Sequence, residues 1–414
     1  MDYSYTLASS IAQTNLDRWR QLCTKEPDPF MDPRFIAAVE KSMGGEARFW
    51  TVIVEDEQGR AAATACLCLL RVDGALLADV RTRALVARVR RFFPNFLQFR
   101  VLFLGLPISA SQSHLRIREG ADTGAVLRVL DAVCGELARR HGARLVVWKE
   151  FDVCESAPLE GLAGLGYRRA ESPPMNHLPT PYGCFEDFCG RMRSRYRRNV
   201  RGSLRKFGDA GLRVDHATGR EAARWFVDDH LHPLYLAVLE HAGGFLEKLP
   251  PAFFRQLFEQ WGDQAVLTVV RREDRAVAWG CSLLCPPAFH MLVMGLDYEA
   301  NGPGDVYFNL VFACLDYAMR RGAREVWIGA NADQFKARLG CAQHRRCFYV
   351  KGRGLLGWLL PLASRRLFPA LPLRRPKRAM RRDHHGVAAS AAEDENLARR
   401  GAGAAAAGGK DAEQ

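Results

Sequence analysis

The chain resembles itself, and this internal repeat constrains its fold more than any other feature of the sequence. The segment Val101–Pro107, VLFLGLP, is similar to Met291–Asp297, MLVMGLD, and each is typical of an apolar strand that ends at Gly-Leu. A loop and a long amphipathic segment follow in both places and end as RRHGARLVVW and MRRGAREVWI. In these endings Gly142 and Gly322 are expected to cap a helix before the next strand.

The similarity extends upstream of these segments. Thr51–Leu70 and Leu267–Cys285 each contain an apolar stretch, a charged turn and a second stretch of small and apolar residues. This pattern predicts a β-hairpin. The order hairpin, strand, helix, strand therefore occurs twice, which predicts a mixed α/β fold made of two tandem halves from an internal duplication and argues against a short-period solenoid.

Changes in composition predict the domain boundaries. The proline-rich segment Ser172–Pro181 breaks both periodicities, so we expect a first half at 1–175 and a second at 176–353. The stretch 354–385 is alternately apolar and basic with several prolines. From 386 to 414 alanine, glycine and charge dominate, and we expect this tail to be disordered because it has almost nothing to bury.

Charge and cysteine content narrow the class of protein. The net charge is +13, and only nine of the 59 basic residues are lysines. Arginine forks suit phosphates and carboxylates, so an anionic partner is expected. The twelve cysteines include no CxxC pair, which predicts free thiols and no metal site. With neither a signal peptide nor an apolar run of about 18 residues, a cytoplasmic location is expected.

The arginine-rich stretch 193–211 is predicted to be an amphipathic helix. Apolar side chains recur at helical spacing and would form one stripe, with arginines on the opposite side. The arginines either form a solvated face or bind phosphate, whereas direct nucleic-acid binding is disfavoured because no recognition-helix pattern accompanies them. The stripe consists of Met192, Tyr196, Val200, Leu204 and Phe207, and the arginines are Arg191, Arg198, Arg201 and Arg205.

The second half resembles a known family. The segment SRYRRNVRGSLRKFGDAG follows NHLPTP and FEDFCGRM, and the stretch from GLDYEANGPGDVYFN to QFKARLGC comes much later. In this order the motifs are similar to those of the GNAT-like N-acyltransferases of the peptidoglycan-biosynthesis group, relatives of the Fem-type aminoacyl transferases. The resemblance covers Asn176–Lys351 well and the first half weakly, through Pro27–Ser42. It implies tandem GNAT-like halves and acyl transfer to an amine, from a coenzyme A thioester or an aminoacyl-tRNA.

The resemblance also implies a donor site. Gly302, Gly304 and Asp305 lie between a predicted strand and a helix N-terminus, where backbone N–H groups and the helix dipole suit the pyrophosphate of an acyl-coenzyme A. Arg198, Arg201 and Lys206 would add a basic face. The sequence NGPGD departs from the family's usual Gln/Arg-x-x-Gly-x-Gly/Ala pattern, so a plain tight turn is the alternative.

Lys336, in QFKARLG, is the strongest catalytic candidate. The resemblance places the matching lysine near the acyl carbonyl, where an ammonium could stabilise an oxyanion or hold a substrate phosphate. The alternative is an exposed lysine on a final loop. Asp297 and Tyr307, with Tyr298 nearby, could carry a proton, although a strand-end turn and a phenol at the edge of the core are the simpler roles for Asp297 and Tyr307.

These observations predict a cytoplasmic, bacterial-type N-acyltransferase. It would move an acyl group from acyl-coenzyme A to an amine, on a small molecule or a cell-envelope precursor, bound between the halves. The first half would be a degenerate structural copy, since its loop SASQSHLRIREGADTG lacks Gly-x-Gly.

One alternative is an aminoacyl-tRNA-dependent amide-bond former, although the Fem-type coiled-coil arm is missing between Phe188 and Gly208. Another is a non-catalytic module that binds polyanions or membranes. The stretch 354–385 could contact the inner face of an anionic membrane.

Overall fold

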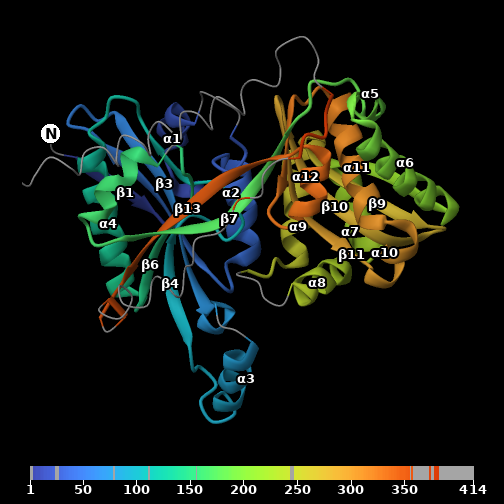
Figure 1. The fold of residues 1–414 in the computed structure, drawn as a ribbon. Helices are drawn as coiled ribbons and strands as arrows, with labels where there is room; N and C mark the ends of the chain where they lie inside the picture. The colour runs from blue at the N-terminus through green and yellow to red at the C-terminus, as the bar shows by residue number, and fades with distance from the viewer. Residues whose placement is uncertain are drawn as a thin grey trace, which may run out of the picture.

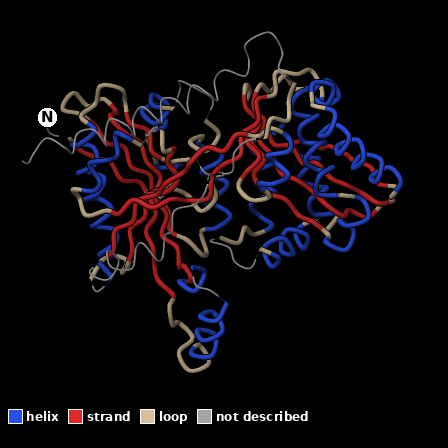
Figure 2. Tube along the Cα trace, in the orientation of Figure 1, coloured by secondary structure: helices blue, strands red, loops and turns tan. Residues whose placement is uncertain are grey.

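A single mixed β-sheet runs through the whole molecule (Figures 1 and 2). The computed structural model describes residues 3–23, 28–77, 80–110, 112–154, 156–242, 247–354, 356–357, 373 and 377–381. Within them the 13-stranded sheet has the order β1-β2-β3-β4-β6-β13-β7-β12-β11-β10-β9-β8, and β5 pairs with β3.

The first half contributes six strands and four α-helices in the described residues. The strands are β1 (Ser4–Ala8), β2 (Arg48–Glu55), β3 (Ala61–Asp73), β4 (Gln98–Leu104), β5 (Leu115–Ile117) and β6 (Leu145–Asp152). The helices are α1 (Leu16–Leu22), α2 (Pro33–Met43), α3 (Val80–Val89) and α4 (Thr123–Arg140).

The rest of the chain supplies the other strands and helices. The strands are β7 (Arg168–Pro179), β8 (Leu212–Thr218), β9 (Ala265–Arg272), β10 (Arg275–Cys285), β11 (Ala288–Leu296), β12 (Glu325–Gly329) and β13 (Ala342–Gly352). The helices are α5 (Phe185–Arg191), α6 (Ser194–Asp209), α7 (Gly219–Asp228), α8 (His232–His241), α9 (Pro251–Trp261), α10 (Tyr298–Gly304), α11 (Val306–Arg320) and α12 (Asp333–Leu339).

The predicted duplication is confirmed. The hairpin β2–β3 is followed by β4, the long helix α4 and β6, and the hairpin β9–β10 is followed in the same way by β11, α11 and β12. In each half the strand before the long helix and the strand after it are parallel neighbours, β4 with β6 and β11 with β12. The expected caps Gly142 and Gly322 have φ of 66° and 80°, a left-handed conformation that glycine adopts without strain.

The two halves exchange strands at the centre of the sheet. Strand β7 begins within the expected first half (1–175), but its end pairs with β12 of the second half, where Leu178 lies opposite Val326. In return β13, the last strand, pairs with β6 of the first half, where Val350 lies opposite Val147. The proline-rich segment Ser172–Pro181, in which we expected the boundary, lies largely inside β7, and its Asn176 and His177 pair with both β12 and β13.

Helices from both halves share one core between them. Helix α2 packs on α9, and the buried side chains there include Phe35 and Ile36 from α2 with Phe253, Phe254 and Leu257 from α9. A second core lies under α5, α6 and α11, and a third lies under α4. The shared core and the exchanged strands together join the halves.

The arginine-rich helix is confirmed as α6. Arg191 and Met192, which we expected on this helix, lie before it at the end of α5; the rest of the apolar stripe is buried or half-buried as predicted, except for Leu204, which is 42% exposed. Lys377–Arg381 of the tail returns to this region, where the Arg193 N–H donates to the Ala379 carbonyl at 2.8 Å. Most of 354–385 and all of the expected disordered tail 386–414 lie outside the described residues. No helix in the described part of the chain is long and apolar enough to cross a membrane.

Candidate active site

A corner at the end of β12 gathers the strongest catalytic candidates. The parallel pairing of β11 with β12 covers only Ala288–His290 opposite Glu325–Trp327. Beyond these residues the two strands are no longer hydrogen-bonded to each other, and β12 ends at Gly329 with a φ of 79°. A short link then turns the chain into α12, which carries Lys336.

Lys336 is a buried lysine and not the exposed loop residue of the alternative interpretation. Its side chain is 2% exposed, and Nζ donates hydrogen bonds to the carbonyls of Gly329 and Ala330, both at 2.9 Å. Burial lowers the pKa of Lys336 from 10.5 to about 8. An ammonium has three N–H donors, so two carbonyls leave one donor for another acceptor.

The exchanged strand β7 helps to build this corner. Asn176 on β7 donates its amide Nδ2 to the Gly329 carbonyl at 3.0 Å and to Asp333 Oδ1 at 3.3 Å. The same Gly329 carbonyl therefore accepts from both Asn176 and Lys336. Because Asn176 is 1% exposed, the carbonyl is held in place from two sides.

Tyr307 lies in the same corner as Lys336. Its ring centroid is 5.6 Å from that of Phe335, the residue before Lys336. Burial raises the pKa of Tyr307, and the nearby Cys341 and Asp333 raise it further. The same two groups act on Lys336. The structure thus brings together a buried cation and a phenol that stays protonated at neutral pH, as a proton donor must.

Asp297 is held in a structural role. Its Oδ1 caps α10 by accepting from the N–H groups of Glu299 and Ala300, and its Oδ2 accepts from Arg275 at 2.8 Å. Both carboxylate oxygens therefore have partners within the protein. The geometry agrees with the strand-end turn that we considered as the simpler role.

The predicted phosphate loop is mostly helical. Gly302 and Gly304 lie in α10, and a side chain at Gly304 would come within 2.4 Å of Leu212. Asp305 then adopts the left-handed conformation at the start of α11 and pairs with Lys206 at 3.3 Å. A carboxylate at a helix N-terminus competes with an anionic ligand for the dipole and the N–H groups. These residues fit a pyrophosphate poorly.

The other two predicted donor residues lie on a separate surface of α6. Arg198 and Arg201 line a hollow of about 580 Å³, together with Ser194, Arg197, Leu204 and Arg205. Lys206 follows Arg201 by five positions, which places it about 140° around the helix. The structure therefore separates Lys206 from the arginine hollow and does not form the single basic face that we expected.

A second cavity lies between the halves, where the sequence analysis expected the acceptor, although none of its lining residues was predicted. It has a volume of about 800 Å³ and is lined by both halves of the chain. We call it the inter-half pocket. Its lining includes Asp28, Arg116, Glu150 and Asp152 from the first half, and His290, Glu325, Trp327, His344 and Arg346 from the second.

Trp327, which lines the inter-half pocket, is surrounded by imidazole and guanidinium groups. The ring centroid of His177 lies 4.6 Å from the Trp327 ring, that of His344 lies 5.2 Å away, and the Arg346 guanidinium is 5.5 Å away. Trp327 alternates along β12 with the buried Val326 and is two residues from Gly329. That spacing is about 7 Å along a strand, so the pocket adjoins the corner that holds Lys336.

The residues around this pocket include polar atoms that are hydrogen-bonded within the protein and buried polar atoms that are not. The His177 ring lies 2.9 Å from Glu325, and this hydrogen bond lowers the pKa of that carboxyl. Three buried atoms, Glu150 Oε2, His290 Nδ1 and Arg346 Nε, have no hydrogen-bond partner. Buried polar atoms are nearly always paired, so these three atoms at one cavity are available to water or to a polar ligand. In the described residues, no group of three or more His, Cys, Asp and Glu side chains could hold a metal ion.

The matching corner of the first half is filled by protein. Lys149 lies within β6, just after the last residue that pairs with β4; it is 5% exposed and donates Nζ to the Pro107 carbonyl at 3.1 Å. A side chain on Gly105, just after β4, would come within 2.5 Å of the Lys149 Cγ atom. The lysine stem therefore occupies the space in which β4 and β6 separate.

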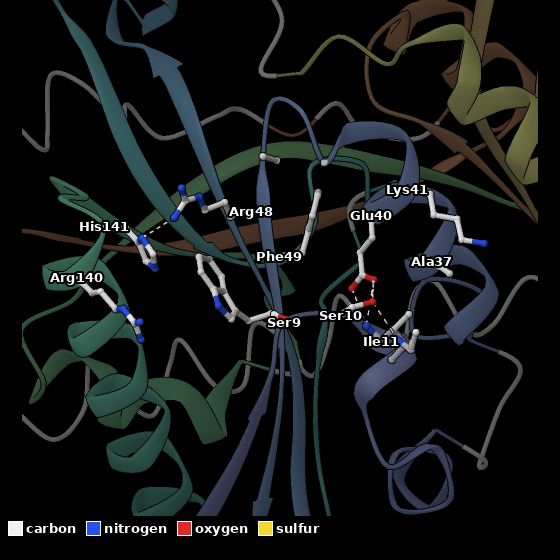
Figure 3. Close-up of a pocket in the computed structure, with 14 residues that line it drawn as sticks. Ser9, Ser10, Ile11, Ala37, Glu40, Lys41, Arg48, Phe49, Arg140 and His141 are labelled. Atoms are coloured by element: carbon white, nitrogen blue, oxygen red, sulfur yellow. Dashed lines mark hydrogen bonds between the residues drawn. The ribbon is translucent and has the colours of Figure 1, made fainter.

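Another hollow, of about 670 Å³, lies in the first half (Figure 3). Its carboxylate, Glu40, accepts from the Ser10 hydroxyl at 2.7 Å and from the Ile11 N–H at 3.0 Å. Figure 3 shows that Glu40 points at this backbone, while Arg48 and His141 lie side by side, joined by a hydrogen bond, away from Glu40. Glu40 therefore fastens the N-terminal segment to α2 and has a structural role.

Comparisons with known proteins agree with this architecture. Residues 194–337 match the model of the acetyltransferase (GNAT) domain. A structure of FemX superimposes with a TM-score of 0.51 at 13% identity, over 88% of this chain and 99% of that one. A tandem GNAT protein from the clavulanic acid biosynthesis pathway has a TM-score of 0.51 at 15% identity, over 85% of this chain and 99% of that one. No curated protein matches. Residues 194–337 thus match the GNAT acetyltransferase domain, and the chain shares the fold of two tandem GNAT-like halves with FemX and the tandem GNAT protein.

Proposed function

We propose that this protein is an N-acyltransferase that moves an acyl group from an acyl-coenzyme A to an amine held in the inter-half pocket. The observation that carries the proposal is the buried ammonium of Lys336 at the open end of β12, next to a pocket with unpaired polar atoms. An acyl carbonyl placed there would receive the third N–H of Lys336.

The reaction needs the protein to stabilise an oxyanion, to protonate the leaving thiolate and to take up a proton from the amine. The amine nitrogen attacks the thioester carbon, the C–N bond forms, and negative charge develops on the carbonyl oxygen, where the Lys336 ammonium would stabilise it. The C–S bond then breaks, and the Tyr307 phenol could give its proton to the departing thiolate. The proton that the amine loses would be taken up by the phenolate, which restores Tyr307.

The anionic part of the donor is placed against α6 in this proposal. Asp305 disfavours phosphate at the α11 N-terminus, whereas Arg198 and Arg201 line a hollow with two further arginines. Guanidinium groups bind phosphate with two parallel hydrogen bonds. The filled corner at Lys149 supports a structural role for the first half, which would form one wall of the acceptor pocket.

Calorimetric titration of acetyl- and longer acyl-coenzyme A tests the donor. We expect binding by the wild type and by Lys336→Met, because that lysine acts on the reacting carbonyl. Arg198→Glu with Arg201→Glu should weaken binding by about tenfold or more, as expected for lost charge-assisted hydrogen bonds. Turnover, followed as free thiol released with a panel of amines, should be lost in Lys336→Met and kept in Lys248→Met, which removes an exposed lysine.

Failure of every thioester to bind would refute the coenzyme A donor. An aminoacyl-tRNA is the second candidate, and the arginine-lined hollow on α6 is the observation that favours it, since arginines also suit an RNA backbone. Amide formation with aminoacyl-tRNA, lost in the α6 double variant, would establish that alternative.

A further inference from the structure

An arm projects from the first half between β3 and β4 and carries α3 (Figure 1). The turn that follows α3 is held in place. The Arg90 guanidinium donates to both carboxylate oxygens of Asp73, at 2.7 and 2.6 Å, and its Nε donates to the Phe96 carbonyl at 2.9 Å. The N–H groups of Phe92 and Phe93 both donate to the Val89 carbonyl at 3.0 Å. The arm therefore presents its tip in a defined conformation.

The tip of the arm is apolar and exposed to solvent. Phe92 is 80% exposed, Phe93 67%, Leu85 63% and Phe96 42%. These are four of the ten exposed large apolar side chains in the described residues, although the arm is a small part of the chain. Single exposed apolar residues are ordinary, but a cluster of aromatic rings on a protrusion indicates a surface that binds something.

The charge of the arm defines the partner. Residues 80–100 contain six arginines and no acidic residue, and Arg88 and Arg91 are exposed near the phenylalanines. The partner must therefore be anionic and must also accept aromatic rings. A bilayer with anionic headgroups has both properties, because rings enter the boundary between headgroups and acyl chains while arginines bind the phosphates. A second copy of the arm would bring like charges together.

We propose that the α3 arm docks the protein on the surface of an anionic lipid bilayer. Phe92 and Phe93 insert at the level of the headgroups, and Arg88 and Arg91 lie on the anionic lipids beside them. Arg90 does not bind lipid in this arrangement, because its guanidinium holds Asp73 and the Phe96 carbonyl. The contact is peripheral and reversible, and its electrostatic part weakens as salt screens the surface.

Co-sedimentation of the full chain with vesicles tests the proposal. The vesicles contain phosphatidylcholine alone or with phosphatidylglycerol. We expect binding that requires phosphatidylglycerol and falls as salt rises. Phe92→Ser with Phe93→Ser, and separately Arg88→Glu with Arg91→Glu, should each lower the bound fraction at least about tenfold at equal lipid. Arg220→Glu with Arg224→Glu on α7 changes the net charge equally at other exposed positions and should bind like the wild type.

Three results would overturn the proposal. The first is that the wild type does not co-sediment with vesicles that contain phosphatidylglycerol. The arm variants could bind as well as the wild type, which would assign membrane contact to another segment, such as 354–385. The wild type could also form a dimer in light scattering that the phenylalanine variant lacks, without vesicle binding, which would make a second copy the partner. Near-identical circular dichroism and unfolding temperatures would show that the exposed substitutions leave the fold intact.

Discussion

The buried ammonium of Lys336 leads to a prediction about stability as well as catalysis. In the folded protein the pKa of Lys336 is about 8, against an ordinary value of 10.5. Below about pH 8 the group is charged in both the folded and the unfolded state, so the full cost of burying the charge is present. As pH rises from about 8 towards 10.5, the folded state loses the proton first while the unfolded state keeps it. The cost is relieved over this window, and stability rises with pH.

The size of the effect follows from the two pKa values. The cost of the buried charge is about 3 kcal/mol at about pH 7 and about 1.5 kcal/mol at about pH 9.5, so the wild type gains roughly 2 kcal/mol between them. The neutral amine keeps two N–H groups, enough for the carbonyls of Gly329 and Ala330. Lys336→Met has no such proton to lose, so its stability relative to the wild type should fall by the same roughly 2 kcal/mol.

Urea unfolding of both proteins at these two pH values measures the double difference. Other titrating groups are common to the two proteins and cancel, and Lys248→Met controls for the loss of one positive charge. If the gap between the wild type and Lys336→Met is the same at both pH values within about 0.5 kcal/mol, the burial argument is wrong. In the enzyme assay, the oxyanion role requires kcat to decline above about pH 8, whereas a rise through this pH would instead make Lys336 a base.

Three further predictions concern packing, acid stability and the acceptor. Gly304→Ala should cost about 1–3 kcal/mol in urea unfolding because its Cβ meets Leu212, whereas Gly302→Ala, with open space around it, should stay within about 0.5 kcal/mol of the wild type. Burial lowers the pKa of His290 to about 4, so its contribution to stability should fall by about 2 kcal/mol between about pH 8 and pH 5. His290→Gln should lack this fall in urea unfolding, and a fall of the same size in the variant would contradict the prediction. Trp327→Ala should raise KM for the amine at least about tenfold and leave the calorimetric affinity for acyl-coenzyme A unchanged, and weakened donor binding would contradict its place in the acceptor pocket.

Much of the fold could be predicted because each element of the repeat has a recognisable pattern within a short stretch of sequence. The matching hairpins, apolar strands and glycine-capped helices each follow from a short stretch of chain, and the structure has them in the predicted order. The exchange of β7 and β13 could not be predicted, since strand neighbours are chosen by contacts between segments far apart in sequence. The proline-rich composition of Ser172–Pro181 suggested a boundary between the halves, but most of the segment lies inside β7.

Of the candidate active site, only single residues with distinctive chemistry could be predicted from the sequence. Lys336 was selected through the resemblance of QFKARLG to the family and because lysines are few, and the structure places Tyr307 against Phe335, the residue before it. Gly304 was misleading as a phosphate contact, because its lack of a side chain serves packing against Leu212. The inter-half pocket gave one signal, the alternation along β12 that turns Glu325 and Trp327 away from Val326. Its other walls come from distant elements, so no single stretch of sequence could reveal it.

The exchanged strand β13 also orders events during synthesis. The ribosome makes the first half early, yet β13, which lies between β6 and β7, is made after every other strand of the described residues. Until then β6 has an open edge, which is a template for pairing with other chains. The amino-terminal half must therefore stay soluble without its last neighbouring strand until β13 has been synthesised. Co-translational folding cannot complete the two halves one after the other. A stop codon before Ala342 would damage the half that was made first.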